Sequence, residues 1–119
     1  MSKNEILKLF PEPVFKYQIE DSTNLNTQLI NYIYTLHDED KKGIERSNRG
    51  GWHSKNFNIN DKDSIQHKFA VQVQKYILDS FMNLGWKTKD TNIQIKEMWA
   101  IINKKNDFNV IHTHPNCYL

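Results

Sequence analysis

Apolar residues between positions 24 and 38 recur every three or four residues, which is the spacing of one face of an α-helix. Asn24 or Asn26 stands at the start of this pattern and can cap the first turn. Charged residues replace the apolar ones from Asp38 onwards, so the helix is predicted to end near His37 or Asp38. The predicted buried face is formed by Leu25, Leu29, Ile30, Ile33 and Leu36.

A second helical pattern begins after residue 61 and is the strongest in the chain. Asp61 or Asp63 can cap its N-terminus, and Gly85 suits the position that follows a helix C-terminus. Aromatic residues at helical spacing are core residues by default, so this stripe is predicted to pack inward and not to bind a cofactor. The stripe comprises Ile65, Phe69, Val73, Tyr76, Ile77 and Phe81, and it is widened by Ala70, Leu78 and Leu84.

Three other stretches, residues 14–19, 92–104 and 108–114, are rich in β-branched and aromatic residues and are predicted to be strands. The first follows two prolines and is expected at a sheet edge. In the second, the pattern alternates: Trp99 and Ile101 are predicted on one face, and Met98, Ala100 and Ile102 on the other. Both faces are apolar beyond Met98, which predicts that the far end is buried on both sides. After a turn at 105–107 the third is predicted to pair back antiparallel with the second. Together with the two helices, these strands indicate an α+β fold.

Residues 47–54 show neither helical nor strand periodicity and are predicted to be a loop. Gly50 and Gly51 permit a tight turn or a close approach of another backbone segment. Trp52 and His53 in such a loop could line a pocket, because binding residues concentrate in loops on a rigid scaffold. In the alternative interpretation Trp52 fills the core and His53 faces solvent.

Length and composition indicate one folded domain. The chain has 119 residues and 12% aromatic residues, which argue against disorder, although its mean hydropathy of −0.75 is polar. The net charge of +2 and the scattered lysines do not indicate a nucleic-acid partner. Cys117 is the single cysteine, which excludes an internal disulfide and a multi-cysteine zinc site. Without a membrane-length apolar stretch or a secretory signal, a cytoplasmic location is expected.

The candidate chemistry lies near the C-terminal end, where His112 and His114 are separated by one residue. In a strand both side chains would lie on the same face, with Cα atoms about 6.6 Å apart. Two imidazoles at this spacing can converge on one metal ion, at about 2.0–2.1 Å from each nitrogen. Two ligands do not complete a catalytic centre, which normally takes three protein ligands and an open position.

Four segments together resemble the family of 2-oxoglutarate/Fe(II)-dependent oxygenases found in marine bacteria and their phages. They are Leu-Phe-Pro-Glu-Pro-Val-Phe at 9–15, Ser-Asn-Arg-Gly-Gly-Trp-His-Ser at 47–54, Trp-Ala-Ile-Ile-Asn at 99–103, and Asn-Val-Ile-His-Thr-His-Pro-Asn at 109–116. The segments follow the family order and span nearly the whole chain.

The resemblance implies the beginning of a double-stranded β-helix (jelly roll) with an N-terminal helical layer. It also implies that Fe(II) and 2-oxoglutarate are cofactors, that His112 is the first iron ligand, and that His114 occupies the position of the carboxylate in the wider superfamily. An imidazole there removes one negative charge and could shift the metal preference toward zinc or nickel. The distal histidine, the base that binds 2-oxoglutarate and the C-terminal strands are expected beyond Leu119.

Trp52, His53 and Asn103 are the candidate pocket residues. The sequence leaves the substrate open, as a small molecule or a peptidyl group. Two other functions stay open as well. One is a non-catalytic jelly-roll module that binds a metal or another ligand. The other is an inactive truncated fragment whose exposed apolar surface makes it associate with further copies.

Overall fold

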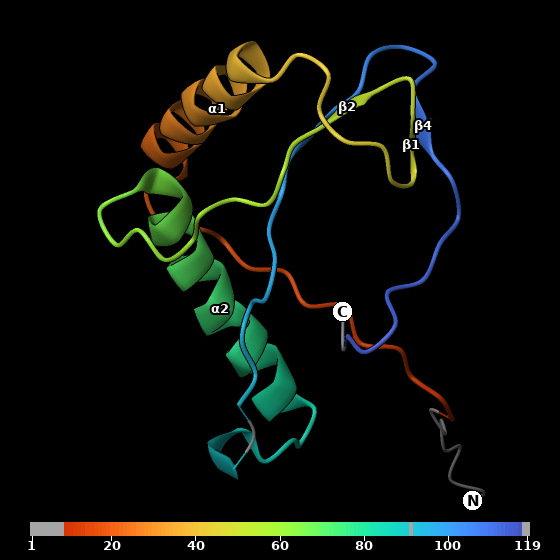
Figure 1. Cartoon of the computed structure of the whole chain (residues 1–119). Coiled ribbons are helices and arrows are strands. Elements are labelled where there is room, and N and C mark those ends of the chain that lie inside the picture. The colour runs from red at the N-terminus through yellow and green to blue at the C-terminus, as the bar shows by residue number, and fades with distance from the viewer. Residues whose placement is uncertain (1–8, 91, 118–119) are drawn as a thin grey trace, which may run out of the picture.

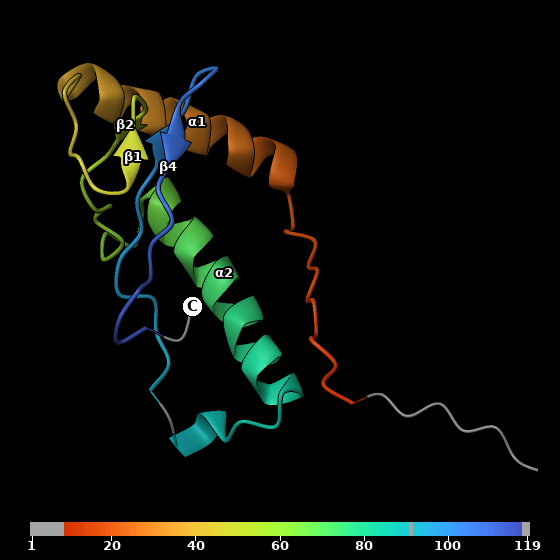
Figure 2. The ribbon, with the colours of Figure 1, turned by 90° about the vertical axis from the view of Figure 1, so that its right-hand side faces the viewer.

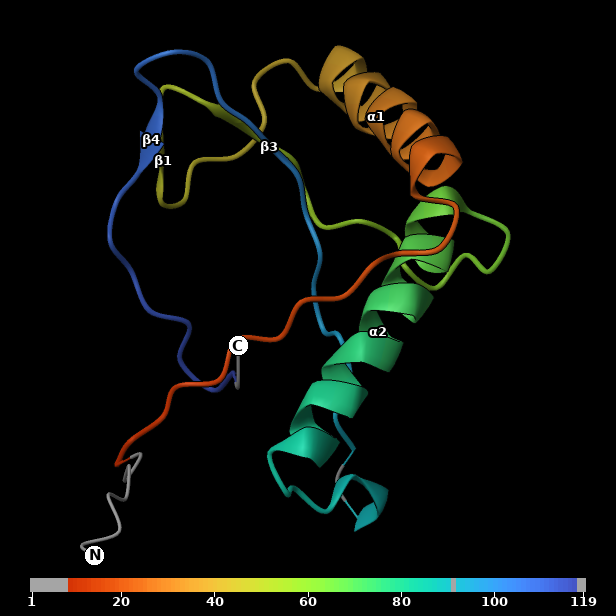
Figure 3. The ribbon, with the colours of Figure 1, turned by 180° about the vertical axis from the view of Figure 1, so that it is seen from behind.

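The computed structural model describes residues 9–90 and 92–117 and shows a small α+β fold with two helices and two small antiparallel sheets (Figure 1). Strands β2 and β3 lie between α1 and the β1–β4 ribbon, as the view from behind shows (Figure 3). The elements in chain order are α1 (Ser22–Glu39), β1 (Asn48–Arg49), β2 (Trp52–His53), α2 (Ile65–Asn83), the short 3-10 helix η1 (Thr88–Asp90), β3 (Ile101–Ile102) and β4 (Phe108–Asn109).

Helix α1 confirms the first predicted helix, and Leu25 and Leu29 are buried on its inner face. The predicted caps are wrong, because Asp21 is the N-cap and both asparagines lie inside the helix. Asp21 has left-handed backbone angles, and its carboxylate accepts a hydrogen bond of 2.9 Å from the amide of Asn24. Ile30 is 53% exposed, so the buried face is narrower than the sequence pattern predicted.

Helix α2 confirms the second predicted helix, but its cap is Ser64 and not Asp61 or Asp63. The Ser64 hydroxyl accepts the backbone N–H of His67 at 3.2 Å, which satisfies one of the free donors of the first turn. Gly85 follows the C-cap with a φ of 82°, as predicted, because glycine adopts this left-handed conformation without steric cost.

Residues 47–54, predicted to be a loop, contain the two strands β1 and β2. A buried asparagine organises the connection between them: the Asn48 side-chain amide donates to the Gly51 carbonyl at 2.8 Å and its oxygen accepts from the Arg46 N–H at 2.8 Å. A Cβ at Gly51 would collide with the side-chain oxygen of Asn103, so the close approach expected of this glycine is confirmed.

Of the strand predicted over residues 92–104, only β3 forms a regular ladder. There Trp52 pairs with Ile102 and His53 with Ile101. Before β3 the segment continues beside the chain after β2, through backbone hydrogen bonds from Ser54 to Ala100 and from Phe57 to Met98. The prediction that the far end is buried on both sides is wrong, because Trp99 is 36% exposed on the face away from α1.

The last predicted strand is shorter than expected and has a different partner. Strand β4 pairs with β1, with Asn109 opposite Asn48 and Phe108 opposite Arg49, and not with the segment that precedes it. One further hydrogen bond, from the Val110 N–H to the Ser47 carbonyl at 2.8 Å, extends this pairing. Residues 111–114 then run without a ladder.

The core lies under the C-terminal half of α1 and is centred on Trp52, Phe57 and Ala100. Because side chains alternate across a strand, even-numbered residues of 98–102 face this core and odd-numbered residues face the opposite side. Three side chains of α1 cover the core, namely Tyr32, Ile33 and Leu36. The alternation predicted from the sequence therefore holds, although most of the segment lacks a regular ladder.

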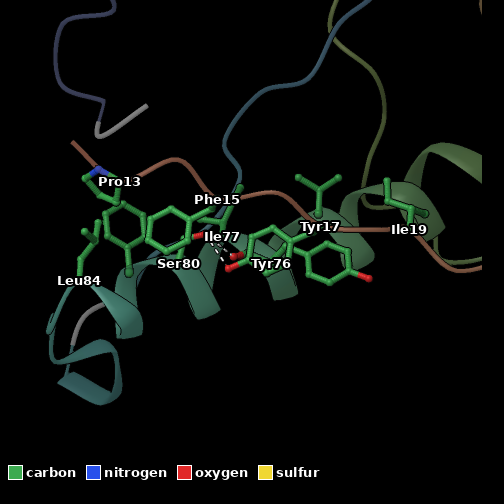
Figure 4. Close-up of a pocket in the computed structure, with 10 residues that line it drawn as sticks. Pro13, Phe15, Tyr17, Ile19, Tyr76, Ile77, Ser80 and Leu84 are labelled. Atoms are coloured by element: carbon green, nitrogen blue, oxygen red, sulfur yellow. Dashed lines mark hydrogen bonds between the residues drawn. The ribbon is translucent and has the colours of Figure 1, made fainter. Parts of the chain in front are cut away.

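Residues 14–19 were predicted to form an edge strand, but they are extended and have no strand partner within the described chain. They lie along α2 instead, with Tyr17 stacked on Tyr76 at 4.6 Å between ring centroids (Figure 4). The Tyr17 hydroxyl also bonds to Asp79 at 2.7 Å and to Ser80 at 3.0 Å. An apolar groove of about 520 Å³ runs between this segment and α2.

The arrangement leaves much of the chain uncovered. Figure 2 shows β1, β2 and β4 gathered at one end of α1, while α2 extends away from them. Large apolar side chains of the described residues remain exposed, among them Phe10, Val14, Phe108 and Ile111. No helix in the described residues is long and apolar enough to cross a membrane.

Candidate metal centre

The two candidate metal ligands converge at one point. The Nε2 atoms of His112 and His114 are 3.0 Å apart and their ring centroids are 4.8 Å apart. Both side chains are exposed and lie on the extended segment after β4, which is not part of a sheet. The pair therefore comes together as the spacing predicted, although the segment is not the regular strand that the sequence indicated.

Backbone contacts define which nitrogen of His112 is free. Its Nδ1 lies 2.8 Å from the Val110 carbonyl oxygen. Because a carbonyl can only accept, Nδ1 carries the proton and donates it, which leaves the lone pair on Nε2. Metal-ligating histidines typically donate their other ring N–H in this way, so His112 has the tautomer that a ligand needs.

A column of aromatic rings supports the second histidine. The His114 ring stacks on Trp99 with centroids 6.2 Å apart and an interplanar angle of 19°. Trp99 stacks in turn on His53, at 5.6 Å and 16°. Residues 53 and 99 are diagonal neighbours on the face of the β2–β3 pair that points away from the core, which explains why these rings meet.

The three predicted pocket residues have different surroundings. Trp52 lies in the core and its indole N–H donates to the Asp40 carbonyl at 2.7 Å, as the core interpretation of this residue predicted. His53 is 5% exposed, so the prediction that it faces solvent is wrong. Its Nδ1 donates to the Ser54 carbonyl at 2.6 Å, and its ring is covered by Trp99. Asn103 lies against Gly51.

The acidic turn after α1 anchors the core next to this face. Asp40 accepts the Gly43 N–H on its carboxylate at 3.1 Å, and this hydrogen bond holds the pKa of the carboxyl below its usual value. Its carbonyl is the acceptor for Trp52. Asp40 thus ties the end of α1 to β2, the strand that carries His53.

The remaining histidines have structural contacts far from the pair in sequence. His37 packs edge-on against Trp52 with centroids 5.1 Å apart, and the Nδ1 of His67 lies 2.6 Å from the Ile59 carbonyl. Cys117 is an exposed free cysteine. Among residues 9–90 and 92–117, no group of three or more His, Cys, Asp or Glu side chains is placed to hold a metal ion.

The 3.0 Å contact between the two Nε2 atoms is a hydrogen bond between the imidazoles. Imidazole nitrogen is a donor that suits iron, zinc, copper and nickel. The pair offers two such donors, fewer than the three protein ligands of a typical catalytic metal centre.

Comparisons with protein-family models, curated proteins and solved structures found no match to this chain. The resemblance to the oxygenases therefore stays a prediction from the sequence.

Trp99 is the site residue whose contact was not predicted. Its alternation with Ile101 placed it on one face of a strand, but its stacking on His114 depends on how β4 and the following segment return past β3. This return is set by the β1–β4 pairing, which joins residues about 60 positions apart and has no local sequence signal.

Proposed function

We propose that this chain supplies two iron ligands, His112 and His114, to a non-haem Fe(II)- and 2-oxoglutarate-dependent oxygenase. The observation that carries the proposal is the 3.0 Å convergence of their Nε2 atoms on an exposed segment. Oxygen-activating iron sites need protein ligands on one side and open positions on the other. An exposed pair of imidazoles on one side of the segment supports the first of these requirements.

Each histidine has its own role in this centre. His112 presents an unprotonated Nε2 because Val110 fixes its tautomer. With His112 in this tautomer, His114 donates its Nε2–H to His112 in the metal-free chain, and it becomes a neutral ligand through Nε2 when Nε2 gives up this proton and Nδ1 carries one instead. When bound, the iron and 2-oxoglutarate supply oxygen activation coupled to decarboxylation of the cosubstrate, and the oxidised substrate is a small molecule or a peptidyl group.

The proposed fold is the start of a jelly roll, with α1 and α2 as the helical layer. The two short antiparallel pairs and the packing of α1 on β2–β3 support this part of the proposal. A third protein ligand and a base for 2-oxoglutarate are contributed from outside the described residues, in which no complete ligand set is present. The proposed location is cytoplasmic.

An anaerobic titration with Fe(II) and 2-oxoglutarate tests this function. The ternary complex is expected to show the weak visible charge-transfer band of 2-oxoglutarate chelated to Fe(II). His112→Ala should abolish the band, whereas the matched variant His67→Ala should keep it because His67 bonds to Ile59 on another element. The titration is made on the full-length protein that contains the third ligand and the base for 2-oxoglutarate. Absence of the band there, with no consumption of 2-oxoglutarate, would contradict the oxygenase function.

A non-catalytic metal-binding module is the second candidate, and the exposed His112–His114 pair supplies its donors. This function predicts that zinc or nickel is retained by His112 and His114 without consumption of 2-oxoglutarate. Metal analysis of the purified chain, combined with a succinate assay, separates it from the oxygenase.

The large exposed surface supports association of copies as a further part of the proposal. Large apolar side chains are exposed, among them Val14, Phe108 and Ile111, and exposed apolar surface is typical of sites of protein association. Light scattering after size-exclusion chromatography should therefore show a species larger than 14.2 kDa. A sharp monomer at all concentrations would contradict this association.

A further inference from the structure

The extended segment that ends in β3 has one paired edge and one open edge. Backbone groups of successive residues point to opposite edges of a strand, and the even-numbered residues of 98–102 pair with residues 52–57. The backbone groups of Glu97, Trp99 and Ile101 therefore point to the other edge. Within residues 9–90 and 92–117, no backbone partner is found for these three residues on that edge.

A side chain covers the neighbouring part of the same edge. The Gln74 amide donates to the Ile93 carbonyl at 2.7 Å, and its oxygen accepts the Ile95 N–H at 2.9 Å. Residues 93 and 95 share the odd numbering of the open residues, so Gln74 takes the place of a strand partner there. The open stretch therefore begins at Glu97 and ends with β3.

A second copy of the chain is complementary to this open edge. Two antiparallel strands related by a twofold axis offer each other the same alternating donors and acceptors. The axis is perpendicular to the sheet, so both copies keep α1 on the same face. On that face Met98 lies opposite Ala100 of the partner subunit, and this apolar pair extends the core to which both residues belong.

Charge favours a register with Trp99 on the axis. All three open residues are then paired, and Glu97 lies opposite Ile101 of the partner subunit. A shift of the axis by one residue toward the C-terminus would place Lys96 opposite Lys104 of the partner subunit. Like charges directly opposite each other destabilise a strand pair, so this shift is disfavoured.

A shift of the axis in the other direction is disfavoured as well. An axis at Met98 requires the N–H of Ile95, which Gln74 already accepts. An axis at Glu97 sets the two Glu97 carboxylates opposite each other. The register with Trp99 on the axis therefore pairs the whole open stretch without opposing like charges.

We infer that two copies of this chain associate by antiparallel pairing of residues 97–101 about a twofold axis at Trp99. The inference rests on the association of copies in the proposed function and names the surface used, but it is independent of metal binding. Each opposed pair of residues exchanges two backbone hydrogen bonds. The stacking of His114 on Trp99 involves only the side chains of these residues.

Sedimentation equilibrium of the whole chain measures the dimer dissociation constant. Glu97→Pro removes an edge donor at an exposed position and should raise this constant by about 10- to 100-fold, since each dimer loses two hydrogen bonds. Lys16→Pro is the control. Lys16 is exposed on the extended segment 14–19, the other strand that a second copy can donate, and its substitution should leave the constant unchanged. Circular dichroism checks that both variants are folded.

Ile101→Lys and Ile101→Glu test the register. They are matched because each replaces the same apolar side chain by a charged one. The introduced lysine lies opposite Glu97 of the partner subunit, so its dimer should be about tenfold tighter than that of the glutamate variant at low salt. The difference should shrink as salt is added. Equal constants, or the opposite order, would overturn the register.

A sample that mixes ¹³C-labelled and unlabelled chains detects the pairing directly. An intermolecular NOE is expected between the Hα atoms of Met98 and of Ala100 of the partner subunit, because these residues form a non-hydrogen-bonded pair in this register.

Intermolecular NOEs elsewhere, or an unchanged dissociation constant in folded Glu97→Pro, would overturn the inference and leave the association of copies standing. A chain that is monomeric at all concentrations would overturn both. Metal binding through His112 is a separate measurement, and neither result changes it.

Discussion

The β2–β3 and β1–β4 pairs have the same length, two residues on each strand, but very different surroundings. One face of β2–β3 packs under α1 around Trp52, and its other face is covered by Trp99 stacked on His53. The β1–β4 pair leaves Phe108 57% exposed, and the segment that follows it carries both candidate metal ligands in solvent. A two-residue ladder is too short to be stable alone, so burial decides which pair is rigid.

This contrast separates the residues that hold the fold from those that can bind. The buried His53 donates to the Ser54 carbonyl and stacks on Trp99. The rings of His112 and His114 are exposed to solvent, and the Val110 carbonyl fixes the orientation of His112. Substitutions in the two regions should therefore affect different properties. Those around β2 should lower the stability of the fold, and those after β4 should reduce metal binding.

The largest effect on stability is expected for Trp52→Ala. Removing this indole from the core should lower the free energy of unfolding by about 3–5 kcal/mol, because a cavity remains and the Asp40 carbonyl loses its donor. Urea denaturation followed by circular dichroism measures the change. Ile111→Ala, at a fully exposed position after β4, should stay within about 0.5 kcal/mol of wild type. Similar losses in both variants would remove the contrast between the two regions.

A smaller effect should distinguish the two kinds of histidine. His53→Ala removes a buried ring that donates to Ser54, and should cost about 1–3 kcal/mol. His112→Ala should change stability by about 0.5 kcal/mol or less while abolishing metal binding. Parallel urea and metal titrations of the two variants check this prediction. It would be refuted if His112→Ala destabilised the fold as much as His53→Ala.

The smallest effect is a change in alkaline stability at the core. Burial raises the pKa of the Tyr32 hydroxyl, and the charge of Glu39 raises it further. A raised folded-state pKa means that the contribution of neutral Tyr32 is complete below the unfolded value of about 10 and is lost as the pH rises through the folded value. Tyr32→Phe should therefore flatten the fall in stability above that pH. Tyr34→Phe, at a 52% exposed position of the same helix, is the control and should leave the slope unchanged.

The helices could be predicted because their signals are local. Apolar periodicity and Gly85 defined α2 and its end, and the alternation around Trp99 assigned residues to the correct faces of 98–102. The caps were missed because Asp21 and Ser64 each compete with nearby polar residues that have similar propensity. Such choices depend on how the preceding turn enters the helix.

The strand partners could not be predicted, because pairing is a long-range property. Residues 14–19 have a strand-like composition. They lie on α2 instead, where alternate side chains contact the apolar surface of the helix and no strand pairing is needed to bury them. Strand β4 pairs with β1 instead of the preceding segment. The convergence of His112 and His114 was predictable from spacing, since any extended backbone places both on one side, whereas the support from Trp99 was not.

The most direct test of the central claim is a long-range ¹H–¹⁵N spectrum of the five imidazole rings during titration with Fe(II) under anaerobic conditions. The metal-free chain should show His112 with its proton on Nδ1. Substoichiometric Fe(II) should then broaden the signals of His112 and His114 first, while those of His37 and His67 persist. Equal broadening of all five rings, or an early response at His37 or His67, would contradict the assignment of this pair as the metal ligands.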